Sequence, residues 1–128
     1  MTKSAISSEN APHPGGPYSQ AIVANGFVYT AGFGPQNPET GATAETVGDQ
    51  TRQVLRNIGA VLAERGLTLD DCVKVTAYLA DMATFPEFND AYREFFTKPY
   101  PVRTTVGAQL SNILVEIDVV AALPAADR

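Results

Sequence analysis

The sequence has one cysteine, one histidine and no tryptophan among its 128 residues. A lone cysteine, Cys72, excludes a disulfide within the chain, and one cysteine with one histidine cannot supply the ligands of a zinc site. Cys72 also adjoins Asp70 and Asp71, whose charges raise the pKa of a thiol, so a structural role is favoured. A Ser-His-Asp triad would depend on His13, which lies between two prolines. No phosphate-binding or dinucleotide-binding loop is present, so no metal or cofactor is expected.

The sequence also lacks long apolar runs and clusters of positive charge. The longest uncharged stretch, residues 11–38, contains five prolines and five glycines, which excludes a membrane helix there. The first ten residues contain one lysine and no apolar segment, so no secretory signal is expected and the predicted location is the cytoplasm. Nine Lys and Arg against fourteen Asp and Glu leave a net charge of −5, which opposes nucleic acid as a partner.

The length of the chain predicts a single domain over residues 1–128. Alternation and turn residues predict strands at residues 3–7, 20–24, 27–30, 72–79, 102–106 and 114–121. Asn25-Gly26 joins the second and third strands and is a strong hairpin signal, because both residue types tolerate positive φ. Apolar residues at three- and four-residue spacing predict a first helix over residues 47–62, which Gly66 ends.

A second helix is predicted from Thr84 to Phe96. Thr84 and Glu87 have the spacing of a capping box, in which a hydroxyl and a carboxylate three residues later bond to the first turn. In the strand at residues 72–79, alternation places four apolar residues on one face: Val73, Val75, Ala77 and Leu79.

The predicted order, β-β-β-α-β-α-β-β, favours an α+β fold with one six-stranded mixed sheet and both helices on one face. The last strand, LVEIDVVA, is wholly apolar on one face and partly apolar on the other. Two helices on one side leave the second face of the sheet uncovered. A partly apolar face without cover would be an unusually large exposed patch, so we expect the chain to oligomerise through it.

Arg103 lies in the middle of a short strand. Alternation puts Arg103 and Thr105 on one face, and Val102, Thr104 and Val106 on the other. A buried arginine at such a position requires an anion. A structural salt bridge or an exposed edge position explains it as well as the functional alternative, which is a guanidinium fork that holds a ligand carboxylate through two parallel hydrogen bonds.

Other polar residues also have ordinary explanations beside functional ones. Glu116 and Asp118 share one face of the last strand, where paired carboxylates can do acid–base chemistry, although solvent-facing charges are the commoner case. Tyr18 follows a Gly-Pro step and is either a positioned donor or a packing aromatic. Asn89 lies in the second predicted helix, where a surface polar residue is the default.

The combination of motifs is more specific than any one of them. They are SENAP at residues 8–12, GPYSQ at 16–20, NPETG at 37–41, NDAYREFF at 89–96, YPVRTTV at 100–106 and VEI at 115–117. In this combination the chain resembles the RidA/YjgF family of imine deaminases, also described as translation inhibitors or endoribonucleases, over residues 4–121.

The resemblance implies a chorismate-mutase-like fold and a homotrimer whose sheets face inward as a barrel, with sites between subunits. It implies that 2-imino acids are hydrolysed to 2-keto acids and ammonia without a metal or cofactor. Arg103 matches the family arginine that binds the substrate carboxylate, and Glu116 matches the glutamate that orients the attacking water. Tyr18 and Asn89 match the family's site tyrosine and asparagine.

Three departures from the family pattern border the expected substrate position. Ala31 replaces the usual serine of Thr-Ser-Gly, and Thr30 cannot substitute for that hydroxyl because neighbours in a strand point to opposite faces. The loop that follows, from Gly32 to Pro35, differs from the usual sequence, and Thr105 stands where many members have cysteine. The expected substrate contacts are therefore Arg103, Asn89, Ala31, Gly32, Phe33 and Thr105.

Three alternatives to a general imine deaminase stay open. A non-catalytic trimer that binds small carboxylates is favoured by the missing serine at Ala31. An enzyme dedicated to a larger imine is favoured by the altered loop at residues 32–35. RNA cleavage is opposed by the acidic charge and by the absence of a well-placed histidine as general acid.

Overall fold

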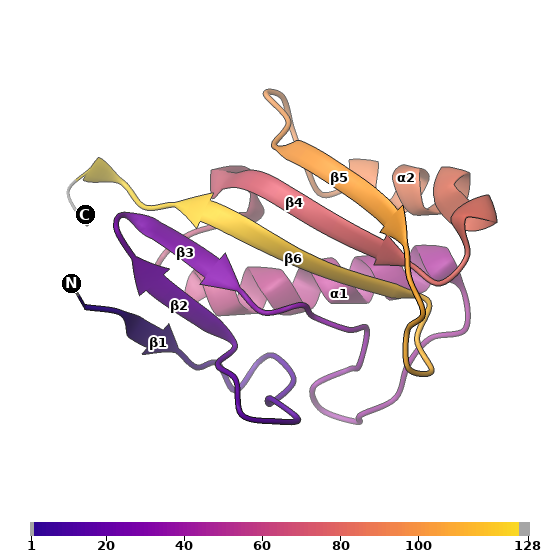
Figure 1. Ribbon diagram of the computed structural model, residues 1–128, viewed down its shortest axis with the longest axis horizontal. Helices are drawn as coiled ribbons and strands as arrows, with labels where there is room; N and C mark the ends of the chain where they lie inside the picture. Colours follow the sequence, from indigo (N-terminus) through magenta and orange to yellow (C-terminus); the bar gives the residue numbers. More distant parts are fainter. Residues whose placement is uncertain (1, 126–128) are drawn as a thin grey trace.

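Six strands form one mixed sheet in the computed structural model, which describes residues 2–125. The strands lie in the order β1-β2-β3-β6-β4-β5, and within the described chain β4 and β5 are the parallel pair. Their bounds are β1 (Ser4–Ile6), β2 (Ala21–Ala24), β3 (Phe27–Thr30), β4 (Cys72–Leu79), β5 (Val102–Gly107) and β6 (Val115–Ala122). Two helices, α1 (Val47–Ala63) and α2 (Phe85–Arg93), lie behind the sheet in Figure 1. The predicted six-stranded mixed sheet with two helices on one face is confirmed.

The β2–β3 hairpin turns at Asn25 and Gly26, as predicted. The φ angle is 53° at Asn25 and 84° at Gly26, the left-handed conformations that a two-residue hairpin requires. The carbonyl of Gly26 also accepts a hydrogen bond from the N–H of Leu123 at 3.0 Å. This bond ties the tip of the hairpin to the residue that follows β6.

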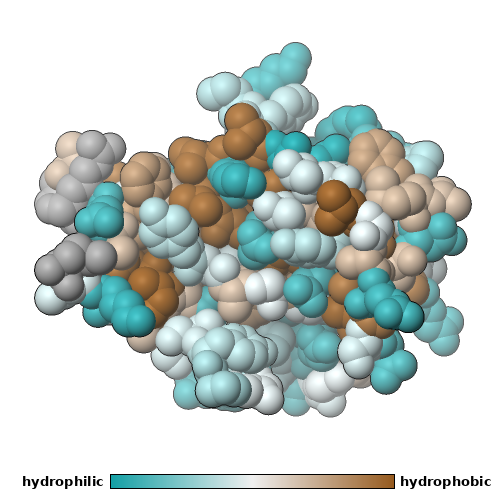
Figure 2. All heavy atoms as spheres, viewed as in Figure 1, coloured by the Kyte–Doolittle hydropathy of each residue, from teal (hydrophilic) through white to brown (hydrophobic). Residues whose placement is uncertain are grey.

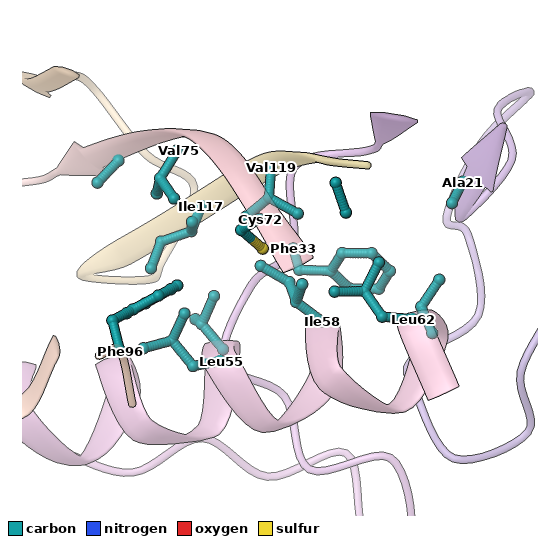
Figure 3. Close-up of a cluster of buried hydrophobic side chains, with 14 of the residues drawn as sticks. Ala21, Phe33, Leu55, Ile58, Leu62, Cys72, Val75, Phe96, Ile117 and Val119 are labelled. Carbon is teal, nitrogen blue, oxygen red and sulfur yellow. The ribbon is translucent and has the colours of Figure 1, made fainter. Parts of the chain in front are cut away.

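Helix α1 packs its apolar face against the sheet. Thr46 caps its N-terminus by accepting a hydrogen bond from the N–H of Asp49 at 3.1 Å. Just beyond its C-terminus Gly66 has a φ of 71°, which glycine adopts without strain, so the predicted stop is confirmed. Figure 3 shows the helix side chains that point toward the sheet: Leu55, Ile58 and Leu62.

The predicted capping box at α2 is wrong. The side chain of Thr84 makes no bond to the first turn, and its hydroxyl instead donates to the carbonyl of Asp81 at 2.6 Å. Glu87 accepts a hydrogen bond from the N–H of Gly48 at 2.8 Å, in the first turn of α1. The carboxylate therefore stabilises the other helix, where the exposed N–H groups attract negative charge.

Two boundaries also differ from the prediction. Helix α2 ends at Arg93, although the Phe96 side chain beyond it is buried. A buried apolar residue just after a helix continues the apolar spacing and cannot be distinguished from a helical one by sequence. In β4, the pairing with β6 shifts register after Cys72, which leaves Val73 43% exposed. The predicted core-facing alternation therefore begins only at Val75.

The sheet face opposite the helices is uncovered within residues 2–125. Figure 2 looks onto this face and shows apolar residues among polar ones. Strands β3 and β5 place large exposed apolar side chains on this face: Phe27, Tyr29, Val102 and Val106. This mixed surface gives oligomerisation a physical reason, while the trimeric barrel stays a prediction. None of the helices in the described residues has the length and apolar character needed to cross a membrane.

Candidate functional site

Arg103 projects from β5 onto the helix-covered side of the sheet. It pairs with Val75 of β4, whose side chain is fully buried on that side. The guanidinium carbon lies 4.6 Å from the ring centroid of Tyr92, 5.4 Å from that of Phe88 and 5.6 Å from that of Phe85. No carboxylate of residues 2–125 forms an ion pair with it. The salt bridge that the sequence left open is therefore not what holds Arg103.

A cavity of about 330 Å³ adjoins Arg103 between α2 and the start of β5. Its lining residues are Asn89, Tyr92, Arg93, Tyr100, Pro101 and Arg103. Asn89 and Arg103 thus border one cavity. None of these lining side chains is acidic, so a carboxylate that enters the cavity meets a positive surface even though the whole chain is acidic.

Two hydroxyl groups on this side of the sheet are buried without a hydrogen-bond partner within the described residues. They are the phenol of Tyr92 and Oγ1 of Thr105. Thr105 follows Arg103 on the same face of β5 and pairs with Ala77 of β4. Burial raises the pKa of Tyr92 to about 12, while the charge of Arg103 acts in the opposite direction. Unpartnered buried hydroxyls are rare in folded proteins and require an explanation.

Glu116 projects from β6 onto the uncovered face. It pairs with Tyr78 of β4, while its neighbours Val115 and Ile117 are fully buried on the helix side. The Glu116 carboxylate lies against the backbone of Gly32, where an added Cβ would come within 3.1 Å of the carboxyl carbon. Any side chain at position 32 would displace the carboxylate, which explains a glycine here.

The backbone comes close to Glu116 because of an irregularity after β3. Tyr29 pairs with Val120, and an isolated bridge joins Phe33 to Ile117. Phe33 is four residues after Tyr29, whereas Ile117 is only three residues before Val120 on β6. The segment that contains Ala31 and Gly32 therefore has one more residue than the part of β6 that it faces. Such bulges redirect the backbone and occur often beside active sites.

Thr30 is part of this irregularity rather than of a ligand site. Its Oγ1 accepts a hydrogen bond from the N–H of Val119 at 3.0 Å, in place of a backbone partner. The hydroxyl therefore has a structural role and does not replace the one that Ala31 lacks, as the sequence predicted.

Tyr18 borders a second cavity, of about 260 Å³, together with the segment at residues 31–34. Its side chain is 54% exposed, and its hydroxyl accepts a hydrogen bond from the N–H of Gly15 at 3.1 Å. His13 borders the same cavity and lies 3.3 Å from Glu9 in an exposed pair. This cavity brings Tyr18 of the GPYSQ motif together with the adjacent residues Ala31 and Gly32.

Gln20 is a structural part of this region that the sequence reading missed. Its Oε1 accepts a hydrogen bond from the N–H of Ser8 at 2.6 Å, and its Nε2 donates to the carbonyl of Pro12 at 2.9 Å. The amide is almost fully buried and holds the loop that carries Tyr18. The GPYSQ motif contained this residue, but a glutamine gives no periodicity or charge signal of its own.

Phe33 has its ring in the hydrophobic core rather than in the cavity. The residue is 5% exposed, and Figure 3 shows the ring between the sheet and α1. Its backbone N–H and C=O both bond to Ile117, at 2.8 and 3.1 Å. The ring is therefore unavailable to a substrate, and only the loop backbone can make the predicted contact.

Asp118 shares the uncovered face with Glu116. The hydroxyl of Tyr78 donates to its Oδ2 at 3.3 Å, and burial raises the pKa of the Asp118 carboxyl.

Cys72, on the helix side, is buried, which raises the pKa of its thiol to about 12, with a further contribution from the charges of Asp71 and Asp70. Its burial and its raised pKa both favour a structural role for the Cys72 thiol.

The predicted site residues thus fall into two groups that the sheet separates. Arg103, Thr105 and Asn89 lie on the helix side near β5. Glu116 lies on the uncovered face against Gly32, with Ala31 and Tyr18 at the adjoining cavity. One chain by itself does not bring the arginine and the glutamate together around a small ligand.

Comparison with known proteins identifies the family of this chain. Residues 8–123 match the family described as Endoribonuclease L-PSP. Reactive Intermediate Deaminase A from the chloroplast of Arabidopsis thaliana is 44% identical over 126 residues, which covers 96% of this chain and 67% of that protein. The chain belongs to the Rid family.

Solved structures of Rid proteins have the same fold. YyfA of Yersinia pestis, from the conserved Rid family, matches with a TM-score of 0.90 and 43% identity, covering 95% of this chain and 100% of that one. TdcF of E. coli, solved with bound serine, matches with a TM-score of 0.88 and 30% identity, covering 94% and 99%. The resemblance seen in the sequence motifs is therefore confirmed at the level of the family and of its fold.

Proposed function

We propose that this Rid protein hydrolyses 2-imino acids to 2-keto acids and ammonia at a site assembled from two copies of the chain. One copy supplies Arg103 and the neighbouring copy supplies Glu116. The observation that carries the proposal is that Arg103 has no acidic partner among the described residues and borders an open cavity without an acidic side chain. An arginine in that setting is suited to a ligand carboxylate.

The carboxylate end of the substrate binds the guanidinium fork of Arg103. Two parallel N–H···O bonds fix both the position and the plane of the carboxylate, which lysine cannot do. Asn89 borders the same cavity and offers an amide donor. The serine bound to E. coli TdcF supports this assignment, because a free amino acid carries the same carboxylate next to C2.

The chemical step requires little besides a positioned water molecule. The carbon of a C=N bond is electrophilic, and Glu116 accepts a proton from the water as its oxygen forms a bond to C2. The electron pair of the C=N bond moves to nitrogen, which takes up a proton. The resulting carbinolamine loses ammonia as its hydroxyl proton leaves and C2=O forms. The main contribution of the protein is to hold water and imine together.

A partner copy is required because of where the two groups lie. Arg103 is on the helix side of the sheet and Glu116 on the uncovered side. The uncovered face needs a partner for its exposed apolar side chains, and in a closed trimer each copy would present its face to both neighbours. A cyclic arrangement then places the Arg103 edge of one chain beside the Glu116 face of the next.

Mixed oligomers test this arrangement directly. Arg103→Ala and Glu116→Gln each abolish activity when every chain carries the change. When the two variants are co-expressed and assemble at random, about a quarter of the interfaces combine an intact Arg103 with an intact Glu116. We therefore expect about a quarter of the wild-type activity in the mixture. A double variant with both changes in one chain, mixed with wild type, is the control for assembly.

An inactive mixture of well-assembled hetero-oligomers would contradict an inter-subunit site.

Ammonia release in the wild type separates hydrolysis from carboxylate binding alone, the alternative that Ala31 favours. A dedicated enzyme for a larger imine would release ammonia only from bulky substrates. Endoribonuclease activity, the description attached to the family, would appear as RNA cleavage that survives in Arg103→Ala. The cytoplasmic location stays a prediction, since relatives of this chain include chloroplastic and mitochondrial proteins.

A further inference from the structure

Helix α2 presents three aromatic rings to Arg103. Phe85, Phe88 and Tyr92 follow one another at spacings of three and four residues, so they share one face of the helix. All three ring centroids lie within 5.6 Å of the guanidinium carbon, and that of Tyr92 is the nearest at 4.6 Å. Ring faces attract a guanidinium at this range. These rings therefore support an arginine that has no acidic partner in the described chain.

The ring of Tyr92 is itself fixed in place. It is 7% exposed and stacks on Phe96, with centroids 4.4 Å apart and planes inclined by 24°. The ring centroid of its other neighbour, Phe88, lies 5.6 Å from that of Tyr92. Phe96 lies beyond the end of α2 and is buried, so it supports Tyr92 from outside the helix. Because Phe96 and Phe88 hold the Tyr92 ring on two sides, the ring gives the guanidinium a fixed surface to pack on.

The hydroxyl of Tyr92 is inaccessible to solvent and forms no hydrogen bond of good geometry within residues 2–125, although Arg103 lies close enough to lower its pKa. Burial raises the pKa of Tyr92 to about 12, so the phenol is neutral at physiological pH and cannot act as a general base. Arg103 acts on this pKa in the opposite direction, as a charge close to the phenol oxygen does. A neutral phenol oxygen beside a guanidinium has lone pairs available for an N–H.

We infer that Tyr92 is a positioning residue for Arg103. Its ring supports the plane of the guanidinium, and its oxygen accepts one N–H while two others turn toward the carboxylate in the cavity. Both contacts restrict rotation of the fork, which otherwise has to be ordered when the ligand binds. The inference rests on the proposed function for the identity of the ligand, but the orientation of Arg103 by Tyr92 is independent of it.

Three variants separate the contributions of the ring and the hydroxyl. Tyr92→Phe keeps the ring and removes the hydroxyl, and Tyr92→Leu removes both. Tyr100→Phe is the matched control, because Tyr100 borders the same cavity but is 51% exposed. Since Tyr92→Leu removes a buried ring and destabilises the core, Tyr92→Phe is the deciding variant.

The first measurement is the NMR signal of the Arg103 side-chain Nε–Hε, assigned by its loss in Arg103→Lys. In the wild type we expect a ring-current shift and slow exchange of the guanidinium protons with water. Tyr92→Phe keeps the shift and exchanges faster, Tyr92→Leu loses both, and Tyr100→Phe changes neither. This readout needs no ligand and no activity.

The second measurement is the Kd of 2-oxobutanoate, a small 2-keto acid, against that of 2-oxobutanamide. Loss of one hydrogen bond in Tyr92→Phe raises the Kd of the acid about two- to tenfold. Tyr92→Leu loses the ring contact as well, and its Kd rises by about ten- to a hundredfold. The amide, which carries no charge, changes little. In the hydrolysis assay, Tyr92→Phe raises KM more than it lowers kcat. A general loss of structure would instead weaken the binding of the acid and of the amide alike.

The outcomes are distinguishable. An Arg103 signal in Tyr92→Phe with the shift and exchange of the wild type overturns the inference, whether or not 2-oxobutanoate binds. Equal weakening of acid and amide in Tyr92→Phe overturns it too, because that result reports damage to the fold. If the wild type fails to bind 2-oxobutanoate, the proposed function fails, and the Arg103 signal alone still decides the role of Tyr92.

Discussion

Arg103 and Glu116 project from opposite faces of one sheet, although only β4 separates the strands that carry them. Arg103 pairs with the buried Val75, and Glu116 pairs with Tyr78, which lies on the other face. The odd separation of Val75 and Tyr78 along β4 places the two functional groups on different sides. The reaction proposed above uses both groups, and this placement is the reason that the proposal includes a second chain.

Replacement of Arg103 by alanine is expected to abolish imine hydrolysis while the chain still folds. Each charge-assisted hydrogen bond contributes about 1.5–3 kcal/mol, so the loss of two lowers kcat/KM by at least about a hundredfold. Arg103→Lys keeps the charge but lacks the planar fork and does not restore activity. Coupled assays that generate the imine with an amino-acid oxidase measure the effect. Near-normal activity in either variant would remove Arg103 from the mechanism.

Gly32→Ala is expected to lower activity by about tenfold or more without unfolding the protein. The new Cβ occupies the place of the Glu116 carboxylate, which must rotate away and loses its position toward the water. The fold tolerates the change because the obstacle is the end of a flexible side chain. Gly59→Ala, where a Cβ meets nothing within 4 Å, is the control. Equal kcat/KM values in the two variants would show that the position of Glu116 is unimportant.

Ala31→Ser is expected to shift preference toward the smallest imino acid. The wild type lacks a hydroxyl here, and a neutral hydrogen bond contributes roughly 0.5–1.5 kcal/mol, which is about two- to tenfold in rate or affinity. The methyl group instead leaves an apolar wall for a larger substrate side chain. The comparison is between imines of leucine or methionine and that of alanine. An unchanged ratio of the two activities would show that position 31 does not set the preference and would assign it to the loop backbone around Phe33.

The protein is expected to sediment as a trimer at micromolar concentration. The uncovered sheet face carries exposed apolar residues, among them Val102 at 67% and Tyr29 at 44%. Val102→Glu should weaken the trimer, because it places a charge on that face, and should leave the fold of the single chain intact. Analytical ultracentrifugation of both proteins tests this. A monomeric wild type would also exclude the inter-subunit site.

Cys72 is expected to resist thiol reagents in the native protein. With a pKa of about 12, about one thiol in ten thousand is ionised at pH 8, so reaction awaits unfolding. The same shift affects stability. Below about pH 8.5 the thiol is protonated in both states, and above it the unfolded chain ionises first, so stability falls as pH rises toward 12. Rapid labelling of the folded protein would show that the thiol is not buried in solution.

Much of the fold was predictable because local chemistry decides it. Asn25-Gly26 specifies a hairpin by its tolerance of positive φ, and the spacing of apolar residues specifies α1. The failures have local causes as well. Thr84 has the residue type of a cap, but its hydroxyl donates to the carbonyl of Asp81 and makes no bond to the first turn of α2. Val73 fits the alternation of β4 until a register shift moves it off the core face.

The sequence by itself determined the strands, the helices, the family and the residue types of the proposed site. It also placed Arg103 and Thr105 on one strand face, because the two-residue period of a strand is local. Only the tertiary structure decided that Arg103 and Glu116 lie on opposite sides of the sheet, since this depends on the pairing of β5 and β6 with β4. It also decided that the ring of Phe33 is buried and that Tyr92 lies against Arg103. Pairing and packing join residues far apart in the chain, and no local pattern records which of them will meet.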